Sequence, residues 1–161
     1  MKNQLSLIFV GFIVLVGCTK QPTFTISGTL TNAADKTIYL EQTALLATTI
    51  VDSCIIDVDG NFSLEAPAPT YPDFYRLRVG SRALPLAIDS TEHVQVSASL
   101  DSLPYTLNIN GSEVSAQMAQ LRASARTATR DVLREQTQKI ILANPRSLVA
   151  YYALFLKQNG L

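Results

Sequence analysis

The sequence has no tryptophan, a single histidine and two cysteines, and its charges cancel. Thirteen basic and thirteen acidic side chains among 161 residues leave no long-range positive field of the kind that attracts nucleic acid. Aromatic residues make up 7% of the chain, so no base-stacking platform is apparent either. We therefore expect no nucleic-acid partner.

Motifs that carry chemistry are also scarce. The sequence has no Cys-x-x-Cys pair, no glycine-rich phosphate loop, no histidine pair at metal-ligand spacing and no Gly-x-Ser-x-Gly elbow. His93 lies in a candidate strand on its polar side, without a nucleophile beside it in sequence. The stretch 57–61 begins like a calcium loop, but Phe62 and Ala68 occupy the positions that need glycine and glutamate. We predict that the chain is not an enzyme and binds no cofactor or metal ion.

The longest apolar run lies at the N-terminus. Residues 1–17 combine Lys2 with about twelve apolar residues, whereas a membrane-spanning helix needs about twenty. The run ends in a sequence that resembles the bacterial lipobox, in which the cysteine receives lipid and becomes the new N-terminus: Leu15, Val16, Gly17 and Cys18. We therefore expect residues 1–17 to be a lipoprotein signal peptide. The alternative is an ordinary cleaved leader in which the cysteine is incidental.

A lipid-modified Cys18 predicts where the mature protein resides. Its acyl chains would hold the protein on a membrane, with residues 18–22 as a short tether. Thr19, which is not acidic, follows the cysteine, so by analogy with lipoprotein sorting signals we expect the outer membrane rather than the inner. The expected location is the bacterial cell envelope, facing the periplasm. Cys54 would then be the only free thiol, so no internal disulfide is expected.

Residues 23–110 show the two-residue alternation of half-buried antiparallel strands. In the first strand, 23–31, Phe24, Ile26 and Leu30 share one face. Seven further strands are expected at 37–41, 48–58, 62–66, 74–79, 84–88, 93–98 and 105–109. Short strands separated by turn residues predict a small antiparallel β-sandwich or barrel.

The turn at 57–61 is expected to close a tight hairpin between the third and fourth strands. A two-residue loop and a three-residue loop are both possible, and we favour the latter because it places apolar residues of both strands on one face: Cys54, Ile56, Phe62 and Leu64. Nothing basic lies near Cys54 in sequence, so we expect a packed thiol rather than a redox-active one.

From residue 111 to residue 161 the periodicity is helical. We expect one amphipathic helix from Ser112 to the Asn144-Pro145 pair and a second over 147–158. The buried face of the first helix is expected to contain Val114, Met118, Leu121, Ala125, Ala128 and Val132. Another face of the first helix repeats a basic residue every fourth position: Arg122, Arg126, Arg130 and Arg134. We interpret this stripe as a solvated face, the alternative being contact with an anionic headgroup or partner.

The second helix carries more apolar side chains than one buried face needs. We expect part of it to be a docking surface that includes Tyr151, Tyr152 and Phe155. The alternative is that both faces pack within the chain.

Five stretches carry a resemblance to a known family: FTISGTLTNAADKTIYLEQ, VDSCIIDVDGNFSLEAPAPTYPDFYRLRV, LPLAIDSTEHVQVSA, INGSEVSAQMAQL and ILANPRSLVAYYAL. They resemble the domain of unknown function, with its helical connector, that precedes the thioredoxin-like domain of bacterial periplasmic thiol-disulfide lipoproteins. The resemblance implies a β-sandwich and a redox neighbourhood. The chain ends before the thioredoxin-like domain would start, so no catalytic residue is carried over.

Two hypotheses for the function follow. In the first, the chain is a non-catalytic, membrane-tethered accessory domain of a thioredoxin-like lipoprotein, truncated or stand-alone, which docks that domain or another envelope protein. In the second, it is an independent envelope lipoprotein that binds a glycan or a peptide.

Overall fold

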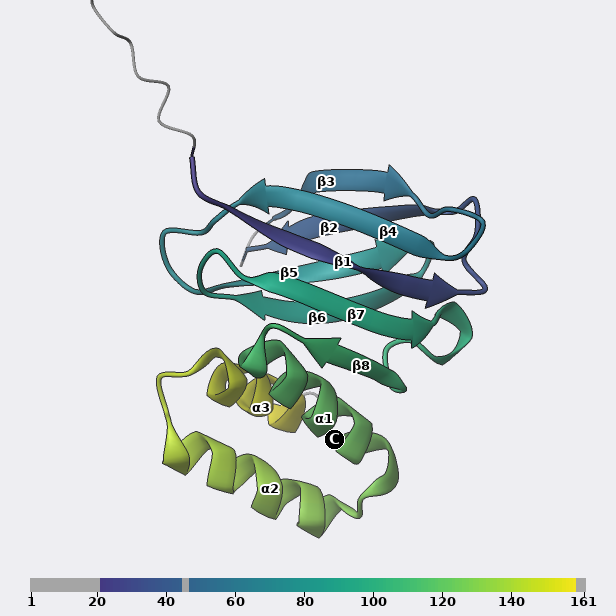
Figure 1. Cartoon of the computed structure of the whole chain (residues 1–161). Helices are drawn as coiled ribbons and strands as arrows, with labels where there is room; N and C mark the ends of the chain where they lie inside the picture. The colour runs from purple at the N-terminus through teal and green to yellow at the C-terminus, as the bar shows by residue number, and fades with distance from the viewer. Residues whose placement is uncertain (1–20, 45–46, 159–161) are drawn as a thin grey trace, which may run out of the picture.

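The structure is a computed structural model that describes residues 21–44 and 47–158. The predicted signal peptide, Leu15, Val16, Gly17 and the predicted lipidation site Cys18 lie outside the described residues. The described part is a β-sandwich of two four-stranded sheets with three helices after it (Figure 1). The predicted fold class, mainly β with C-terminal helices, is confirmed.

One sheet has the strand order β4-β1-β7-β8 and the other β3-β2-β5-β6. The strands are β1 (Thr23–Thr31), β2 (Thr37–Thr43), β3 (Thr48–Ile55), β4 (Asn61–Pro67), β5 (Asp73–Val79), β6 (Arg82–Ile88), β7 (His93–Ser99) and β8 (Leu107–Asn110). A short 3-10 helix, η1 (Leu100–Ser102), precedes β8. The pairs are antiparallel except that β1 runs parallel to β7.

The core between the sheets is built by the predicted alternation. Phe24, Ile26 and Leu30 are at most 2% exposed, as expected for the inward face of β1. Gly28 occupies the same face, where the backbone of β7 comes so close that a Cβ atom would lie 1.8 Å from the carbonyl oxygen of Val96. The glycine therefore lets the central pair of strands approach each other.

The predicted hairpin between the third and fourth strands is wrong. The turn at 57–61 is present, but β3 and β4 belong to different sheets. β4 buries one face in the core between the sheets and pairs with β1 instead, while β3 packs its half-buried Val51 and Cys54 against the same core. Ile56, Phe62 and Leu64 are buried there, while Cys54 is half-buried and packs against them.

The first predicted helix is two helices, α1 (Glu113–Thr127) and α2 (Arg130–Ala143), and α3 (Leu148–Gln158) follows. The chain is extended at Ala128 and Thr129, which breaks the helix. The chain changes direction at this break, and Leu133 of α2 becomes buried, with 4% exposure. Val132, which was expected on the buried face, is 45% exposed.

The helices form a second, smaller core on one side of the sandwich. Its buried residues come from all three helices and from β6: Ala87, Met118, Leu121, Leu133, Val149, Tyr152, Ala153 and Leu156. Phe74 of β5 packs against it. Ala87 faces away from the sandwich core because its neighbours Leu86 and Ile88 point inward. Residues of both cores lie between positions 24 and 156, so a form of the protein that begins at Gln21 retains them.

Two serine hydroxyls join the start of α1 to β6. Ser115 Oγ accepts a hydrogen bond from the backbone N of Ala87 at 3.0 Å and donates one to the carbonyl oxygen of Ala87 at 2.9 Å. Ser112 Oγ donates to the same oxygen at 3.2 Å and accepts from the backbone N of Ser115 at 3.4 Å. The capped helix start predicted at Ser112 is confirmed, and the cap also attaches α1 to the sheet edge.

Candidate functional site

One face of α3 is buried and the opposite face is apolar but exposed. Val149, Ala153 and Leu156 lie in the second core. Tyr151, Leu154 and Phe155 point outward and are 64%, 42% and 57% exposed. A soluble amphipathic helix normally has polar residues on its solvent side. We call these three residues the α3 outer face.

Tyr152, expected on the docking surface, is not part of it. Its side chain lies on the buried face of α3 and is 6% exposed, because a position one residue from Tyr151 is turned by about 100° around the helix. Its hydroxyl accepts a hydrogen bond from Nη1 of Arg122 at 2.8 Å, and its ring stacks on Phe155 at 6.5 Å between centroids. Tyr152 holds α3 against α1.

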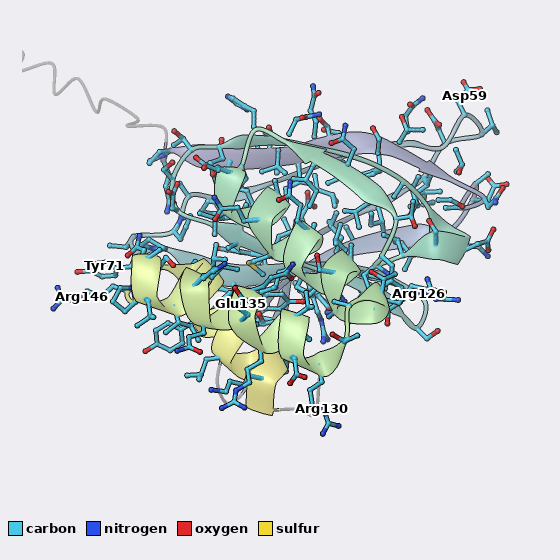
Figure 2. All side chains as sticks on the ribbon, turned by 90° about the horizontal axis from the view of Figure 1, so that it is seen from below. Asp59, Tyr71, Arg126, Arg130, Glu135 and Arg146 are labelled. Carbon is cyan, nitrogen blue, oxygen red and sulfur yellow. The ribbon has the colours of Figure 1, made fainter. Side chains whose placement is uncertain are left out.

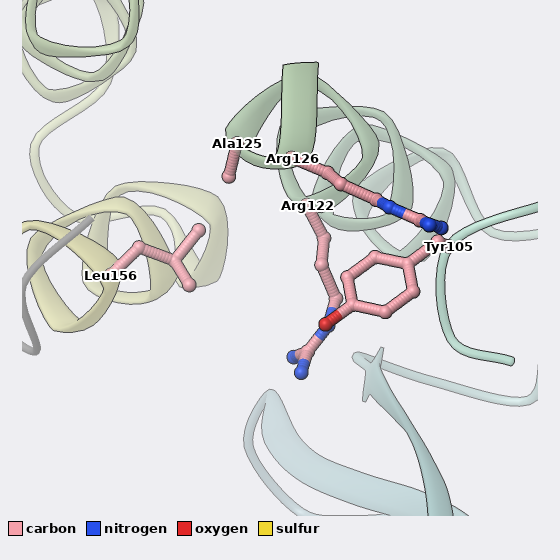
Figure 3. Close-up of a pocket in the computed structure, with 5 residues that line it drawn as sticks. All are labelled: Tyr105, Arg122, Ala125, Arg126 and Leu156. Atoms are coloured by element: carbon pink, nitrogen blue, oxygen red, sulfur yellow. The ribbon is translucent and has the colours of Figure 1, made fainter. Parts of the chain in front are cut away.

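The first two arginines of the predicted stripe line a small cavity, the arginine pocket (Figure 3), of about 120 Å³. Arg122 and Arg126 lie beside the Tyr105 ring, with guanidinium carbons 5.8 Å and 5.1 Å from its centroid. Ala125 and Leu156 complete the lining, and Leu156 points from α3 toward the cavity. Cation–π contacts of about 0.5–1 kcal/mol each offset the repulsion of about 0.2–0.5 kcal/mol between like charges four residues apart.

The interpretation of the arginine stripe as a solvated face holds for three of its four residues, since Arg126, Arg130 and Arg134 are exposed. Arg130 and Arg134 are exposed on α2, and together with Lys157 they line another cavity, of about 170 Å³. Arg122, in contrast, is half-buried. The break between α1 and α2 separates the two pairs of arginines, which a single straight helix would have kept in line.

The charges of the chain are unevenly distributed although they cancel overall. Residues 21–110 carry ten acidic and four basic side chains, and residues 111–158 carry three acidic and seven basic ones. Asp59 at a tip of the sandwich and Arg130 on the helical side point away from each other (Figure 2). The helical layer is therefore the basic part of a neutral protein.

A second group of side chains lies beside the proline-rich loop between β4 and β5. Residues 66–73 line an open cavity of about 460 Å³ together with Gln42, Val51 and Tyr75. Gln42 Nε2 donates to Oδ2 of Asp73 at 2.7 Å, and Tyr71 is 79% exposed on the loop. Burial raises the pKa of the Tyr75 hydroxyl above its ordinary value, and the charge of Asp73 adds to the increase. Aromatic, proline and amide groups of this kind suit a sugar or a peptide.

Glu41 forms an ionic cluster with two arginines on β5. Its carboxylate accepts hydrogen bonds from Nε of Arg76 and from Nε of Arg78, the latter at 2.7 Å, and Arg78 also lies 4.3 Å from the centroid of the Tyr39 ring. Burial raises the pKa of Glu41, but the hydrogen bonds and charges of the two arginines outweigh it and leave the pKa lowered. The cluster ties β2 to β5.

His93 and the acidic turn at 57–61 have structural partners. His93 Nδ1 lies 2.8 Å from Oγ1 of Thr25, on the neighbouring strand. Asp57 Oδ1 accepts hydrogen bonds from the backbone N of Asp59 and of Asn61, at 2.9 Å and 2.7 Å, and the bonds to Asn61 are the main cause of its lowered pKa. Across residues 21–44 and 47–158, no three potential metal ligands cluster. No helix in this part combines the length and the apolar character that crossing a bilayer requires.

The arginine pocket could not be found by sequence reasoning. Tyr105 was expected at the start of a strand, but β8 begins at Leu107, and Tyr105 lies in the preceding loop against α1. The i, i+4 spacing of Arg122 and Arg126 gave the only signal, and that spacing is also typical of a solvated helix face.

The chain belongs to the family described as Domain of unknown function (DUF4369), whose sequence profile matches residues 24–118. The match covers all eight strands and the first part of α1.

Two further comparisons add no functional argument. A search of curated proteins gives no match. Among solved structures, the chain is similar to a 9R-lipoxygenase from Cyanothece PCC8801, with a TM-score of 0.36 and 13% sequence identity over 91% of this chain. The chain spans 27% of the length of that lipoxygenase.

Proposed function

We propose that the chain is a non-catalytic, lipid-anchored accessory domain of the bacterial cell envelope that docks a protein partner through the α3 outer face. The observation that carries the proposal is the apolar character of α3 on both of its sides, with Tyr151, Leu154 and Phe155 outward. Exposed apolar residues gathered on one face favour a protein contact.

The partner that we propose is a thioredoxin-like domain. Support comes from the resemblance of five stretches of the sequence to the N-terminal part of thiol-disulfide lipoproteins. The chain itself would not exchange disulfides, because Cys54 is half-buried and dithiol turnover needs a second, resolving thiol.

A binding assay tests the docking. A thioredoxin-like domain from a related lipoprotein is added in trans, and Tyr151→Lys and Phe155→Lys are compared with Val58→Lys, which changes a 79% exposed apolar residue on the sandwich. We expect binding at micromolar concentrations that falls at least tenfold in the two α3 variants and is unchanged in the control. Absence of binding at high micromolar concentration would refute this partner, and reductase turnover by the chain alone would refute the non-catalytic role.

The lipid anchor has a separate test. Mass spectrometry of the membrane fraction should show a mature protein that begins at a diacylglyceryl-modified and acylated Cys18. An unmodified thiol at Cys18 in a soluble periplasmic species would refute it. Fractionation of the two membranes should place the protein in the outer one.

The second candidate function is an independent envelope module that binds a glycan or a peptide. The cavity of about 460 Å³ beside the proline-rich loop, with Tyr71 79% exposed at its rim, favours it. Glycan-array and peptide-library binding that is lost in Tyr71→Ala and kept in Tyr151→Lys would support this function over docking.

A further inference from the structure

Among the described residues, no carboxylate forms an ion pair with either arginine of the arginine pocket. Within residues 21–44 and 47–158 the ion pairs involve Glu41 and the exposed pair Glu135 and Lys139, and neither Arg122 nor Arg126 takes part in one. The Tyr105 ring lies against both guanidinium groups. An aromatic face attracts a cation but leaves its hydrogen-bond donors unused.

Arg122 in particular has donors to spare. Nη1 bonds to the hydroxyl of Tyr152, whereas Nε is buried and has no acceptor in the described part of the chain. Buried donors without an acceptor are uncommon in native proteins, and each needs an explanation. Guanidinium groups present parallel N–H donors whose geometry matches the two oxygens of a carboxylate or a phosphate.

The opposite wall of the pocket is apolar. Ala125 and Leu156 form it, and the cavity of about 120 Å³ exceeds by far the roughly 10–15 Å³ that one water needs. The space suits an anionic group with a few carbon atoms rather than a nucleotide or a sugar. A wider cavity of about 550 Å³ shares Tyr105 and Arg126 and is lined by small residues, three of them with hydroxyl groups: Thr106, Ala123, Ser124 and Thr127.

We propose that the arginine pocket is a binding site for an organic carboxylate, held by Arg122 and Arg126 and contacting Leu156 through its apolar part. The wider cavity gives the remainder of a larger ligand a polar surface to lie on. The site is separate from the α3 outer face, since Leu156 lies on the buried side of that helix. The proposal therefore goes beyond the docking function and does not depend on it.

The test is a titration of the full chain, in a nonionic detergent at constant ionic strength, followed by the amide NMR shifts of α1. Isobutyrate is the probe, and acetate, phosphate and isobutanol are compared with it. We expect saturable binding of isobutyrate with a dissociation constant on the order of 1 mM, as suits a ligand of its size. Acetate should bind about fifteenfold more weakly because it lacks two methyl groups. Isobutanol should not bind.

Variants separate the site from a general charge effect. Arg126→Gln and Arg122→Gln should each weaken isobutyrate binding at least tenfold. Arg146→Gln removes a positive charge outside the pocket, so this variant should bind isobutyrate like the parent chain. Because Arg126 is exposed, its variant should fold even if the Arg122 variant does not.

Three results would overturn the proposal. The first is the absence of saturable shifts up to about 50 mM isobutyrate, and the second is unchanged affinity in Arg126→Gln. The third is equal affinity for phosphate, acetate and isobutyrate. Equal affinities would assign the pocket to oxyanions in general and exclude the apolar contact.

Discussion

Replacement of Ser115 by alanine should weaken the attachment of the helical layer to the sandwich. The Ser115 hydroxyl is fully buried and forms two hydrogen bonds with the backbone of Ala87. Without it the N–H of Ala87 has no acceptor, while the carbonyl oxygen keeps the hydroxyl of Ser112. An unsatisfied buried backbone group costs about 1–3 kcal/mol, so we expect Ser115→Ala to lower the free energy of unfolding by about 2 kcal/mol.

Ser112 provides the matched comparison. Ser112→Ala removes a longer hydrogen bond to Ala87 and the N-cap of α1, so it should cost about 1 kcal/mol. In the double variant the carbonyl oxygen of Ala87 loses both donors. The loss of unfolding free energy in the double variant should therefore exceed the sum of the two single losses, by on the order of 0.5 kcal/mol or more.

Urea unfolding of the form that begins at Gln21 measures these values, with circular dichroism and tyrosine fluorescence as the two signals, because the chain has no tryptophan. A loss of 2 kcal/mol corresponds to a decrease of about 7 °C in Tm for a domain of this size. A loss below about 0.5 kcal/mol in Ser115→Ala, or additive losses in the double variant, would refute the role of Ser115 as the attachment of α1.

Three further predictions concern single residues. Gly28→Ala should lower the free energy of unfolding by at least about 3 kcal/mol, because the new Cβ atom would overlap the carbonyl of Val96. Gly80→Ala, with no atom nearby, should lower it by about 1 kcal/mol, and equal losses of the two variants in urea unfolding would contradict this prediction. Glu41→Gln should lower the free energy of unfolding by about 2 kcal/mol at pH 7. Because the pKa of Glu41 is lowered in the folded protein, the stability difference between the variant and the parent chain should shrink as the pH falls through about 4.5 and below it. A stability difference that does not depend on pH would argue against a contribution from the charge of Glu41. Cys54→Ala should cost about 1 kcal/mol, and alkylation of Cys54 should be slower in the native than in the unfolded protein, an expectation that equal rates would exclude.

Most of the strands were predictable because one face of each is buried, whereas β3 has only half-buried residues on its inner face. Alternation along β1 identified Phe24, Ile26 and Leu30 as core residues without knowledge of any partner strand. Pairing was not predictable from the same pattern. The turn at 57–61 is compatible with a hairpin and with a crossing between sheets, and the choice depends on β1, which lies far away in sequence and pairs with β4.

The helical layer shows where periodicity misleads. Val132 continues the heptad-like spacing of α1, but the extended residues Ala128 and Thr129 reset the phase, so Leu133 is buried in its place. Tyr152 was assigned to the docking surface because an apolar helix gives no sign of which side packs. The arginine pocket depends on Tyr105, whose loop position follows from the tertiary structure alone.

The position of β1 in the middle of its sheet determines how the domain responds to force. β1 is hydrogen-bonded to β4 along one side and to β7 along the other, over nearly its whole length. A pull on residue 21 along the strand direction shears both ladders at once, so their hydrogen bonds share the load and must break together. Peeling an edge strand would break them one after another. The sandwich is thus built to resist tension applied at its N-terminal end.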